Sequence, residues 1–227
     1  MGPIRINATG CALMDYIYPN LSFNSPVFKK YLSVSEGDGG LSPGKLVFAE
    51  EIEKFSGNQI NSIINELTGS AAPISSNIGG PAIVSMINAA QLLGNDAEIK
   101  FFGALGDDPI GKEFLGLLAK TPVDDANFMI VNGLTAFTDV LFDPDYENGF
   151  GERCFINNIG AARNFEPDLI PGYFFNAEIV VFGGTALVPQ VHDQLNNLLL
   201  KARKQNCFTI VSTVYDFRNE KNHPGRA

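Results

Sequence analysis

The sequence predicts an α/β fold built on a mostly parallel β-sheet. Segments in which apolar residues recur at helical spacing alternate along the chain with short strands, the pattern of repeated strand–helix–strand units. Two of these strands, residues 179–182 and 207–215, are apolar on both faces, as expected where helices cover both sides of a sheet. We therefore expect one α/β domain, with room for an appendage in a chain of 227 residues.

The first half of the chain predicts two strands and three helical segments. A strand over residues 4–9 ends at Gly10, and residues 19–44 have the composition of a loop. Apolar residues at helical spacing over 48–67 predict a helix that breaks at Gly57 and stops at Gly69.

The next segments continue the alternation of helix and strand. A Gly-Gly-Pro sequence at 79–81 opens a second helix, which ends before Gly94. A strand over 99–105 follows, and Asp108 then caps a helix whose first residue is Pro109.

After residue 128 the apolar period changes to two. Residues 128–131, 134–142 and 153–157 predict strands, and we expect the block 128–157 to form a separate antiparallel ribbon. The alternation then resumes in three segments, a strand over 179–182, a helix over 191–202 and a strand over 207–215. Because only a polar stretch follows that apolar last strand, either a partner covers it or the sequence is the front part of a longer protein.

Composition excludes several classes of protein. Hydrophobic residues make up 45% and charged residues 18%, which excludes a mainly disordered chain. The net charge is −9 and no Lys/Arg cluster is present, so no nucleic-acid partner is expected. Three scattered cysteines exclude a disulfide framework, and no apolar run or signal peptide predicts membrane contact, so a cytoplasmic protein is expected.

Three motifs have a functional and a structural interpretation. Residues 106–113 nearly match a phosphate-binding loop, but Glu113 replaces the hydroxyl that would hold magnesium, which favours a simple strand-to-helix turn. Asp15 follows the first strand, where a carboxylate could accept hydrogen bonds from two substrate hydroxyls or could be a solvated loop residue. Asp216 and Arg218 follow the last strand, where they could form an ion pair that faces a ligand or an ion pair on the surface.

Taken in order, the segments resemble the ribokinase-like (PfkB) family of carbohydrate and nucleoside kinases. The most specific is the strand followed by Gly-Asp-Asp and Gly111, and the resemblance covers nearly the whole chain except about 19–70. The segments are 10–15 (Gly-Cys-Ala-Leu-Met-Asp), 77–80 (Asn-Ile-Gly-Gly), 102–111, 134–136, 151–153, 160–161, 182–184 and 216–218.

This resemblance implies a ribokinase-like three-layer α/β/α core, present in part, with an antiparallel β lid. Residues 1–227 would be the N-terminal part of the kinase domain, with lid segments at about 12–48 and 128–158. It also implies ATP-dependent phosphorylation of a sugar-like hydroxyl with Mg²⁺, and it allows a homodimer formed through the lid. The apolar last strand offers the exposed sheet edge as another route to a homodimer. The implied substrate-binding residues are Asp15, Gly79, Gly80, Ser85, Ala136, Phe155 and Gly184, with Asp216 and Arg218 on the nucleotide or substrate side.

The sequence also departs from the family pattern. Val84 or Ser85 stands where the family usually has Asn, and Leu13 stands where ribokinases have a sugar-binding Asn. The Gly-Ala-Gly-Asp motif that carries the catalytic aspartate is absent, so we expect the substrate-binding part of a kinase with no catalytic residue in this chain and most of the ATP site beyond residue 227. The alternatives are a non-catalytic sugar- or nucleoside-binding protein and a nucleoside kinase.

Overall fold

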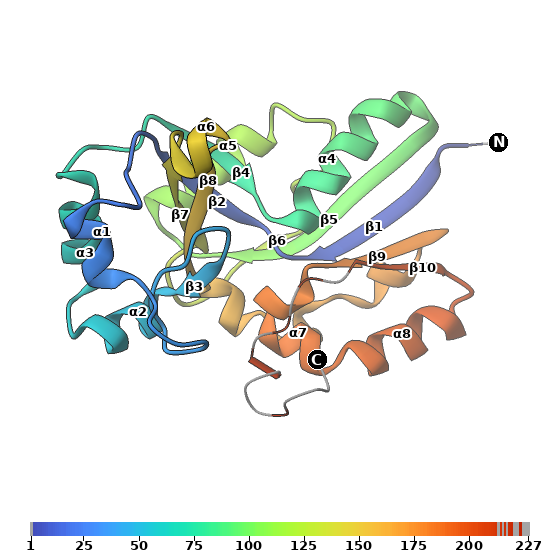
Figure 1. Cartoon of the computed structure of the whole chain (residues 1–227). Helices are drawn as coiled ribbons and strands as arrows, with labels where there is room; N and C mark the ends of the chain where they lie inside the picture. Colours follow the sequence, from blue (N-terminus) through green and yellow to red (C-terminus); the bar gives the residue numbers. More distant parts are fainter. Residues whose placement is uncertain (1, 213, 215, 217, 220–222, 224–227) are drawn as a thin grey trace. The chain divides into compact units, whose positions relative to one another are not determined.

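A computed structural model of the protein contains two units, each with its own β-sheet (Figure 1). The structure describes residues 2–212, 214, 216, 218, 219 and 223. The large unit takes residues up to 14, residues 78–136 and the described residues from 159 onward, and the small unit takes residues 15–77 and 137–158.

The large unit is built on a five-stranded sheet in the order β10-β9-β1-β5-β6. The pairs β1–β5, β1–β9, β9–β10 and β5–β6 are all parallel, which confirms the predicted α/β class. The strands are β1 (Ile4–Gly10), β5 (Ala97–Leu105), β6 (Phe128–Ile130), β9 (Ile179–Gly183) and β10 (Phe208–Ser212).

Helices flank this sheet on both faces, giving the predicted three layers. Helix α4 packs against β1, β5 and β9 through a buried apolar stripe that includes Ile83 and Met86. Figure 1 shows α7 and α8 on the opposite face from α4. The helices are α4 (Pro81–Leu93), α5 (Pro109–Leu118), α7 (Pro189–Asp193) and α8 (Leu195–Lys204), with short 3-10 turns at Gly94–Asp96, Gly160–Asn164, Pro167–Leu169, Gly172–Phe175 and Thr185–Leu187.

The small unit has a second five-stranded sheet in the order β3-β8-β7-β2-β4. Strands β7 and β8 pair antiparallel, while β3 pairs parallel with β8. The elements are β2 (Leu13–Tyr18), α1 (Pro26–Tyr31), β3 (Leu46–Phe48), α2 (Ala49–Ser56), α3 (Ile60–Thr68), β4 (Ser75–Gly79), β7 (Phe137–Asp143), α6 (Tyr146–Gly149) and β8 (Glu152–Asn158).

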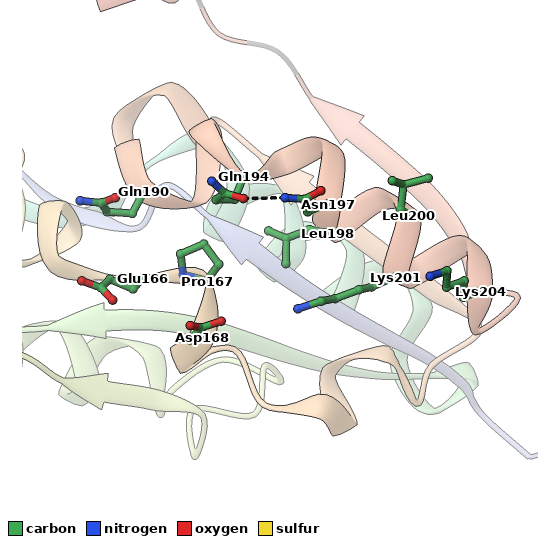
Figure 2. Close-up of a pocket in the computed structure, with 10 residues that line it drawn as sticks. All are labelled: Glu166, Pro167, Asp168, Gln190, Gln194, Asn197, Leu198, Leu200, Lys201 and Lys204. Atoms are coloured by element: carbon green, nitrogen blue, oxygen red, sulfur yellow. Dashed lines mark hydrogen bonds between the residues drawn. The ribbon is translucent and has the colours of Figure 1, made fainter.

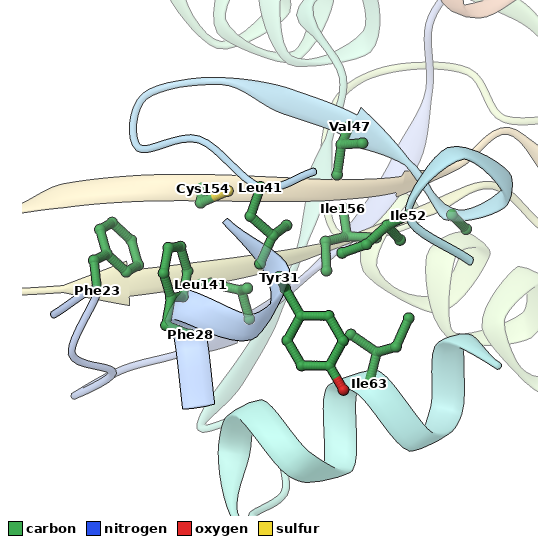
Figure 3. Close-up of a cluster of buried hydrophobic side chains, with 11 residues drawn as sticks. Phe23, Phe28, Tyr31, Leu41, Val47, Ile52, Ile63, Leu141, Cys154 and Ile156 are labelled. Carbon is green, nitrogen blue, oxygen red and sulfur yellow. The ribbon is translucent and has the colours of Figure 1, made fainter. Parts of the chain in front are cut away.

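A separate core closes one face of the small sheet (Figure 3). Helices α1, α2 and α3 contribute Phe28, Ile52 and Ile63, which pack on Leu141 and Ile156 from β7 and β8. Each of these side chains is at most 1% exposed. Burying one such side chain fully contributes about 1.5–3 kcal/mol, so this core holds the three helices to the sheet.

Residues 128–131 are not part of a ribbon with β7 and β8, and that prediction is wrong. Strand β6 pairs parallel with β5 in the large sheet. The Phe128 ring stacks on Phe101 at 5.5 Å and meets Phe114 at 5.2 Å. Gly103 leaves room for the ring, because a Cβ there would lie 2.7 Å from it. The packing of Phe128 against aromatic residues of β5 and α5 places β6 in the large sheet. The alternation of apolar residues along 128–131 does not reveal this packing.

Other differences concern short elements. The predicted loop over 19–44 contains α1, whose cap Ser25 accepts the Phe28 N–H at 3.1 Å. Strands β2, β3 and β4 were not predicted, and β4 begins with the polar sequence Ser-Ser-Asn. The helix break at Gly57, with φ 72°, and the Asp108 cap are confirmed. The expected helix over 191–202 is divided at Gln194 into α7 and α8.

The last predicted strand is shorter than expected. Strand β10 ends at Ser212, and part of the predicted range 207–215 lies outside the described residues. Its apolar side chains are not covered on both faces, since Phe208 is 67%, Ile210 43% and Val211 42% exposed. Among the described residues no helix is both long and apolar enough to cross a membrane.

Candidate functional site

A group of glycines brings backbone segments of the large unit into close contact. Gly10 ends β1 and lies in register with Gly183, which ends β9. A Cβ on Gly10 would stand 1.8 Å from the Gly183 carbonyl oxygen, and a Cβ on Gly80 would stand 2.6 Å from the Cys11 carbonyl oxygen. Gly80 also has φ 98°, a conformation that favours glycine. No other residue fits these positions without movement of the backbone.

These glycines lie at the point where the order of the large sheet reverses. From β1 the chain first builds outward through β5 and β6, and later returns to the other side of β1 through β9 and β10. Open α/β sheets bind ligands outside the carboxyl ends of strands at such a point. Helix α4 begins there, with Gly80 as an N-cap that supplies no side-chain hydrogen bond. The positive end of this 13-residue helix therefore presents only backbone groups, with no capping side chain in front of them.

The structure brings several of the predicted residues to this place. Gly184 has φ 55°, and a Cβ on it would lie 2.6 Å from Pro81 and 3.0 Å from Cys11. Gly79 ends β4 directly before Gly80. Ser85 lies one turn into α4, where its hydroxyl donates to the Pro81 carbonyl at 2.6 Å. Ala136 is buried, and its carbonyl accepts the Met14 N–H at 3.0 Å.

One face of the small sheet is closed by the helices. Tyr18 packs against the apolar cluster of Figure 3, and its hydroxyl is hydrogen-bonded to Asp139. The rings of Tyr16 and Phe137 meet on this same face, with centroids 5.9 Å apart, because alternate residues of a strand share a face. Burial raises the pKa of Asp139 to about 6, although the Tyr18 hydroxyl partly opposes that rise.

Asp15 lies on the opposite face of the small sheet. It alternates with Tyr16 in strand β2, whereas one of its two interpretations from the sequence was a solvated loop residue. Phe155 shares this face, because it lies in register with Val140, which alternates with Asp139. Burial raises the pKa of Asp15 to about 6, and the charge of Arg153 lowers it in part. Two predicted site residues, Asp15 and Phe155, therefore share one face of one sheet.

Two polar residues on the Asp15 face were missed by the sequence analysis. Thr138 and Asn157 lie in register on β7 and β8, and the Asn157 amide nitrogen donates to the Thr138 hydroxyl at 2.8 Å. Both are buried, at 4% and 1% exposure. A signal was available, since Asn157 stands two residues after Phe155 in a predicted strand and so shares its face.

The near match to a phosphate-binding loop is held by internal hydrogen bonds. Asp108 accepts the Gly111 N–H at 2.7 Å and the Thr135 hydroxyl at 2.9 Å. The Thr135 hydroxyl in turn accepts the Gly106 N–H at 2.9 Å. Although burial acts against it, these hydrogen bonds hold the pKa of Asp108 below its usual range. This geometry favours the interpretation as a capped turn.

Asp216 and Arg218 have partners on α7. Asp216 lies 2.7 Å from the ring Nε2 of His192, whose Nδ1 is 2.8 Å from the Thr185 hydroxyl. Burial alone would raise the pKa of Asp216. The hydrogen bonds from Asn219 and the interaction with His192 outweigh burial, so the pKa lies below its usual range. Arg218 makes a two-pronged contact with Asp193. His192 is thus a partly buried link in this network.

Among the residues that the structure describes, no group of three or more His, Cys, Asp or Glu side chains could hold a metal ion. Helix N-termini remain as anion-binding elements.

One groove of the large unit lies elsewhere (Figure 2). It measures about 630 Å³ and is lined mainly by α7, α8 and the segment 166–168. Its charges are mixed, because Glu166 and Asp168 line it together with Lys201 and Lys204 of α8. None of the predicted site residues lines this groove.

Comparison with known proteins gives a consistent result. The model of the pfkB family of carbohydrate kinases matches residues 53–223. No curated protein matches the chain. Among solved structures, a probable sugar kinase from Rhizobium etli CFN 42 superposes with a TM-score of 0.67 and 16% identity, covering 97% of this chain and 59% of that one.

Two further structures are of named kinases. Adenosine kinase from Schistosoma mansoni in complex with 2-fluoroadenosine gives a TM-score of 0.70 and 17% identity over 96% of this chain and 57% of that one. Halothermothrix orenii fructokinase gives a TM-score of 0.58 and 12% identity over 92% and 56%. The chain therefore spans less than two thirds of the length of these structures.

Proposed function

Because the chain belongs to the pfkB family of carbohydrate kinases, we propose that it forms the substrate-binding part of an ATP-dependent kinase acting on a hydroxyl of a sugar or nucleoside. The observation that carries this proposal is that glycines let the backbone at the ends of β1 and β9 come close to the start of α4. This place is also the point where the strand order of the large sheet reverses. Backbone N–H groups at such a helix start suit a polar, hydroxyl-rich ligand. ATP, when bound, would supply the phosphoryl group, with magnesium as its counter-ion.

Each predicted residue has a part in this proposal. Asp15 accepts hydrogen bonds from substrate hydroxyls, and Gly79, Gly80 and Gly184 allow backbone to approach the ligand. Ala136, Phe155 and Ser85 line the substrate side, and Asp216 with Arg218 lies on the nucleotide or substrate side. The lid segments at about 12–48 and 128–158 belong largely, but not wholly, to the small unit, which takes residues 15–77 and 137–158. The catalytic aspartate is not assigned to any residue of this chain.

A second candidate is a non-catalytic sugar- or nucleoside-binding protein. It is favoured by the described residues, which supply the glycine-built helix start but no group of three or more His, Cys, Asp or Glu side chains that could hold a metal ion. Both candidates share the Asp15 site and differ only in phosphoryl transfer.

The test is calorimetric titration of wild type and Asp15→Asn with D-ribose, D-fructose and adenosine. A charge-assisted hydrogen bond contributes about 1.5–3 kcal/mol, so the Asn variant should bind at least about tenfold more weakly. Its melting temperature should stay equal or rise, because a buried carboxylate is removed. Wild-type affinity should fall as the pH drops below about 6, where Asp15 becomes protonated, whereas the variant should show no such change.

Asp139→Asn is the matched control, since Asp139 lies on the helix-covered face of the same sheet. It should leave affinity unchanged. Equal affinity of wild type and Asp15→Asn for every ligand would remove Asp15 from the site, and absence of any binding by the wild type would refute the proposed function.

A further inference from the structure

Asn157 presents a buried acceptor without a partner. Its side chain is 1% exposed, its amide nitrogen donates to Thr138, and its carbonyl oxygen Oδ1 has no hydrogen-bond partner among the described residues. Buried polar atoms are nearly always hydrogen-bonded, because leaving one unpaired costs free energy. A ligand hydroxyl or a bound water would supply the partner that this atom lacks.

Thr138 fixes where that atom points. The hydrogen bond of 2.8 Å between neighbouring strands holds the Asn157 amide in one plane. A side chain held in this way is pre-organised, so little entropy is lost when a ligand binds to it. Thr138 is buried as well, so solvent does not compete for the pair.

Asn157 shares its sheet face with Asp15. Thr138 is opposite Asn157 in the β7–β8 register, and Asp15 lies on the same face of β2, the strand on the other side of β7. Strands lie about 4.8 Å apart, so the strands that carry Asp15 and Asn157 are spaced roughly 10 Å apart across the sheet. Asp15 and the unpaired oxygen of Asn157 thus lie on the same face of the small sheet, on strands separated by β7.

We propose that Asn157, held by Thr138, is a specificity-determining residue that hydrogen-bonds one substrate hydroxyl distinct from those bound by Asp15. The inference rests on the proposed function and adds a second polar contact to it. A hydroxyl is the group that fits, because it can donate to an amide oxygen and can equally accept from an amide nitrogen if the amide is turned. A site built in this way rejects an analogue that lacks the hydroxyl, since the buried amide is then left unpaired.

The test is a double-mutant cycle between the protein and the ligand. Binding of adenosine, D-ribose, D-fructose and their monodeoxy analogues is measured by calorimetry for wild type and Asn157→Leu, which keeps the approximate size. Deletion of one particular hydroxyl should weaken wild-type binding by about tenfold or more, and binding to Asn157→Leu by less than about threefold. Asp15→Asn should instead couple to a different hydroxyl.

Two further variants keep the test decisive. Thr138→Val preserves the side-chain shape but releases Asn157, and should reduce the same coupling without abolishing it. Asn158→Leu is the matched control, because Asn158 is the next residue of β8 and faces the other side. It should leave every coupling at the wild-type value.

The outcomes separate the two proposals. One outcome is that removing a ligand hydroxyl weakens binding to Asn157→Leu by the same factor as binding to wild type, for every deoxy analogue. If Asp15→Asn still weakens binding in that case, the Asn157 proposal is overturned and the proposed function stands. A raised melting temperature with unchanged selectivity in Asn157→Leu would have the same meaning, with a structural water as the partner. If wild type binds none of the probes, both proposals are overturned.

Discussion

Two aspartates of the small sheet illustrate how burial acts on single residues. Asp15 and Asp139 lie on opposite faces, and burial raises the pKa of each to about 6 from an ordinary value of 3.8. A carboxyl whose pKa is higher in the folded state favours folding while it is protonated. That contribution is complete below pH 4 or so and is lost as the pH rises to about 6. At neutral pH both charges therefore destabilise the fold.

Asp139→Asn tests this at the residue where function is not involved. The amide keeps a hydrogen-bond acceptor for Tyr18 and removes the buried charge, so the free energy of unfolding at pH 7 should rise by up to about 3 kcal/mol. The gain should vanish near pH 4. Urea unfolding followed by circular dichroism at several pH values measures it, with the exposed Asp145→Asn as control. A gain independent of pH would contradict the explanation.

Among the elements, the start of α4 depends on what glycine permits. Gly80 combines φ 98° with a Cβ position 2.6 Å from the Cys11 carbonyl oxygen. The Ile83 N–H donates to that same carbonyl at 3.3 Å, so the first turn of α4 is bonded to the chain leaving β1. The close approach of helix and strand therefore has a steric requirement and not only a preference.

Gly80→Ala should lower the free energy of unfolding by about 2 kcal/mol or more, because a positive φ costs a side chain about 1–2 kcal/mol and the contact adds to it. Gly116→Ala in α5 is the matched control, since no atom lies within 4 Å of its Cβ position. That change should stabilise by roughly 0.5–1 kcal/mol. Thermal melts of both variants measure the difference, and equal effects would disprove the steric argument.

Strand β10 is the element that predicts association. It ends the strand order beside β9 and exposes Phe208, Ile210 and Val211, and an apolar strand edge is a template for pairing with another chain. The protein should self-associate at high concentration. Ile210→Lys should reduce this association, as measured by sedimentation velocity.

Leu92→Lys is the control for that measurement, because Leu92 is 87% exposed on α4 and away from any strand edge. If the Leu92 variant alone dissociates, or if the wild type sediments as a stable monomer, edge pairing is excluded. Association that survives Ile210→Lys would instead favour the proposed dimer through the lid.

For the whole molecule, the prediction concerns catalysis. Phosphoryl transfer needs groups that stabilise charge at the transferred phosphoryl, and one such group alone can contribute about 10² to 10³ in rate. The 227-residue chain lacks Gly-Ala-Gly-Asp, and its described residues hold no metal-ligand cluster. We expect no phosphate transfer from ATP to D-ribose, D-fructose or adenosine above background.

A coupled assay for ADP release checks this, with ligand binding by the same preparation as proof that the protein is folded. Turnover at rates typical of kinases would show that the 227-residue chain contains catalytic groups and would contradict this prediction. The result separates the binding part of the proposal from its catalytic part.

The sequence by itself determined the elements whose cause is local. The period of apolar residues, the Asp108 cap and the break at Gly57 depend on neighbours a few residues away, and all were predicted. The α/β class follows from the same alternation, and the order of the glycine and aspartate segments was sufficient to identify the family.

Only the tertiary structure decided the features that depend on distant residues. Strand β6 joins β5 because Phe128 packs on Phe101, and the polar strand β4 forms because a neighbouring strand offers it hydrogen bonds. Asp15 acquired its raised pKa from burial, and Asn157 became a candidate only when register placed it beside Thr138. Burial and pairing are sums over residues far apart in the chain, and no local pattern carries them.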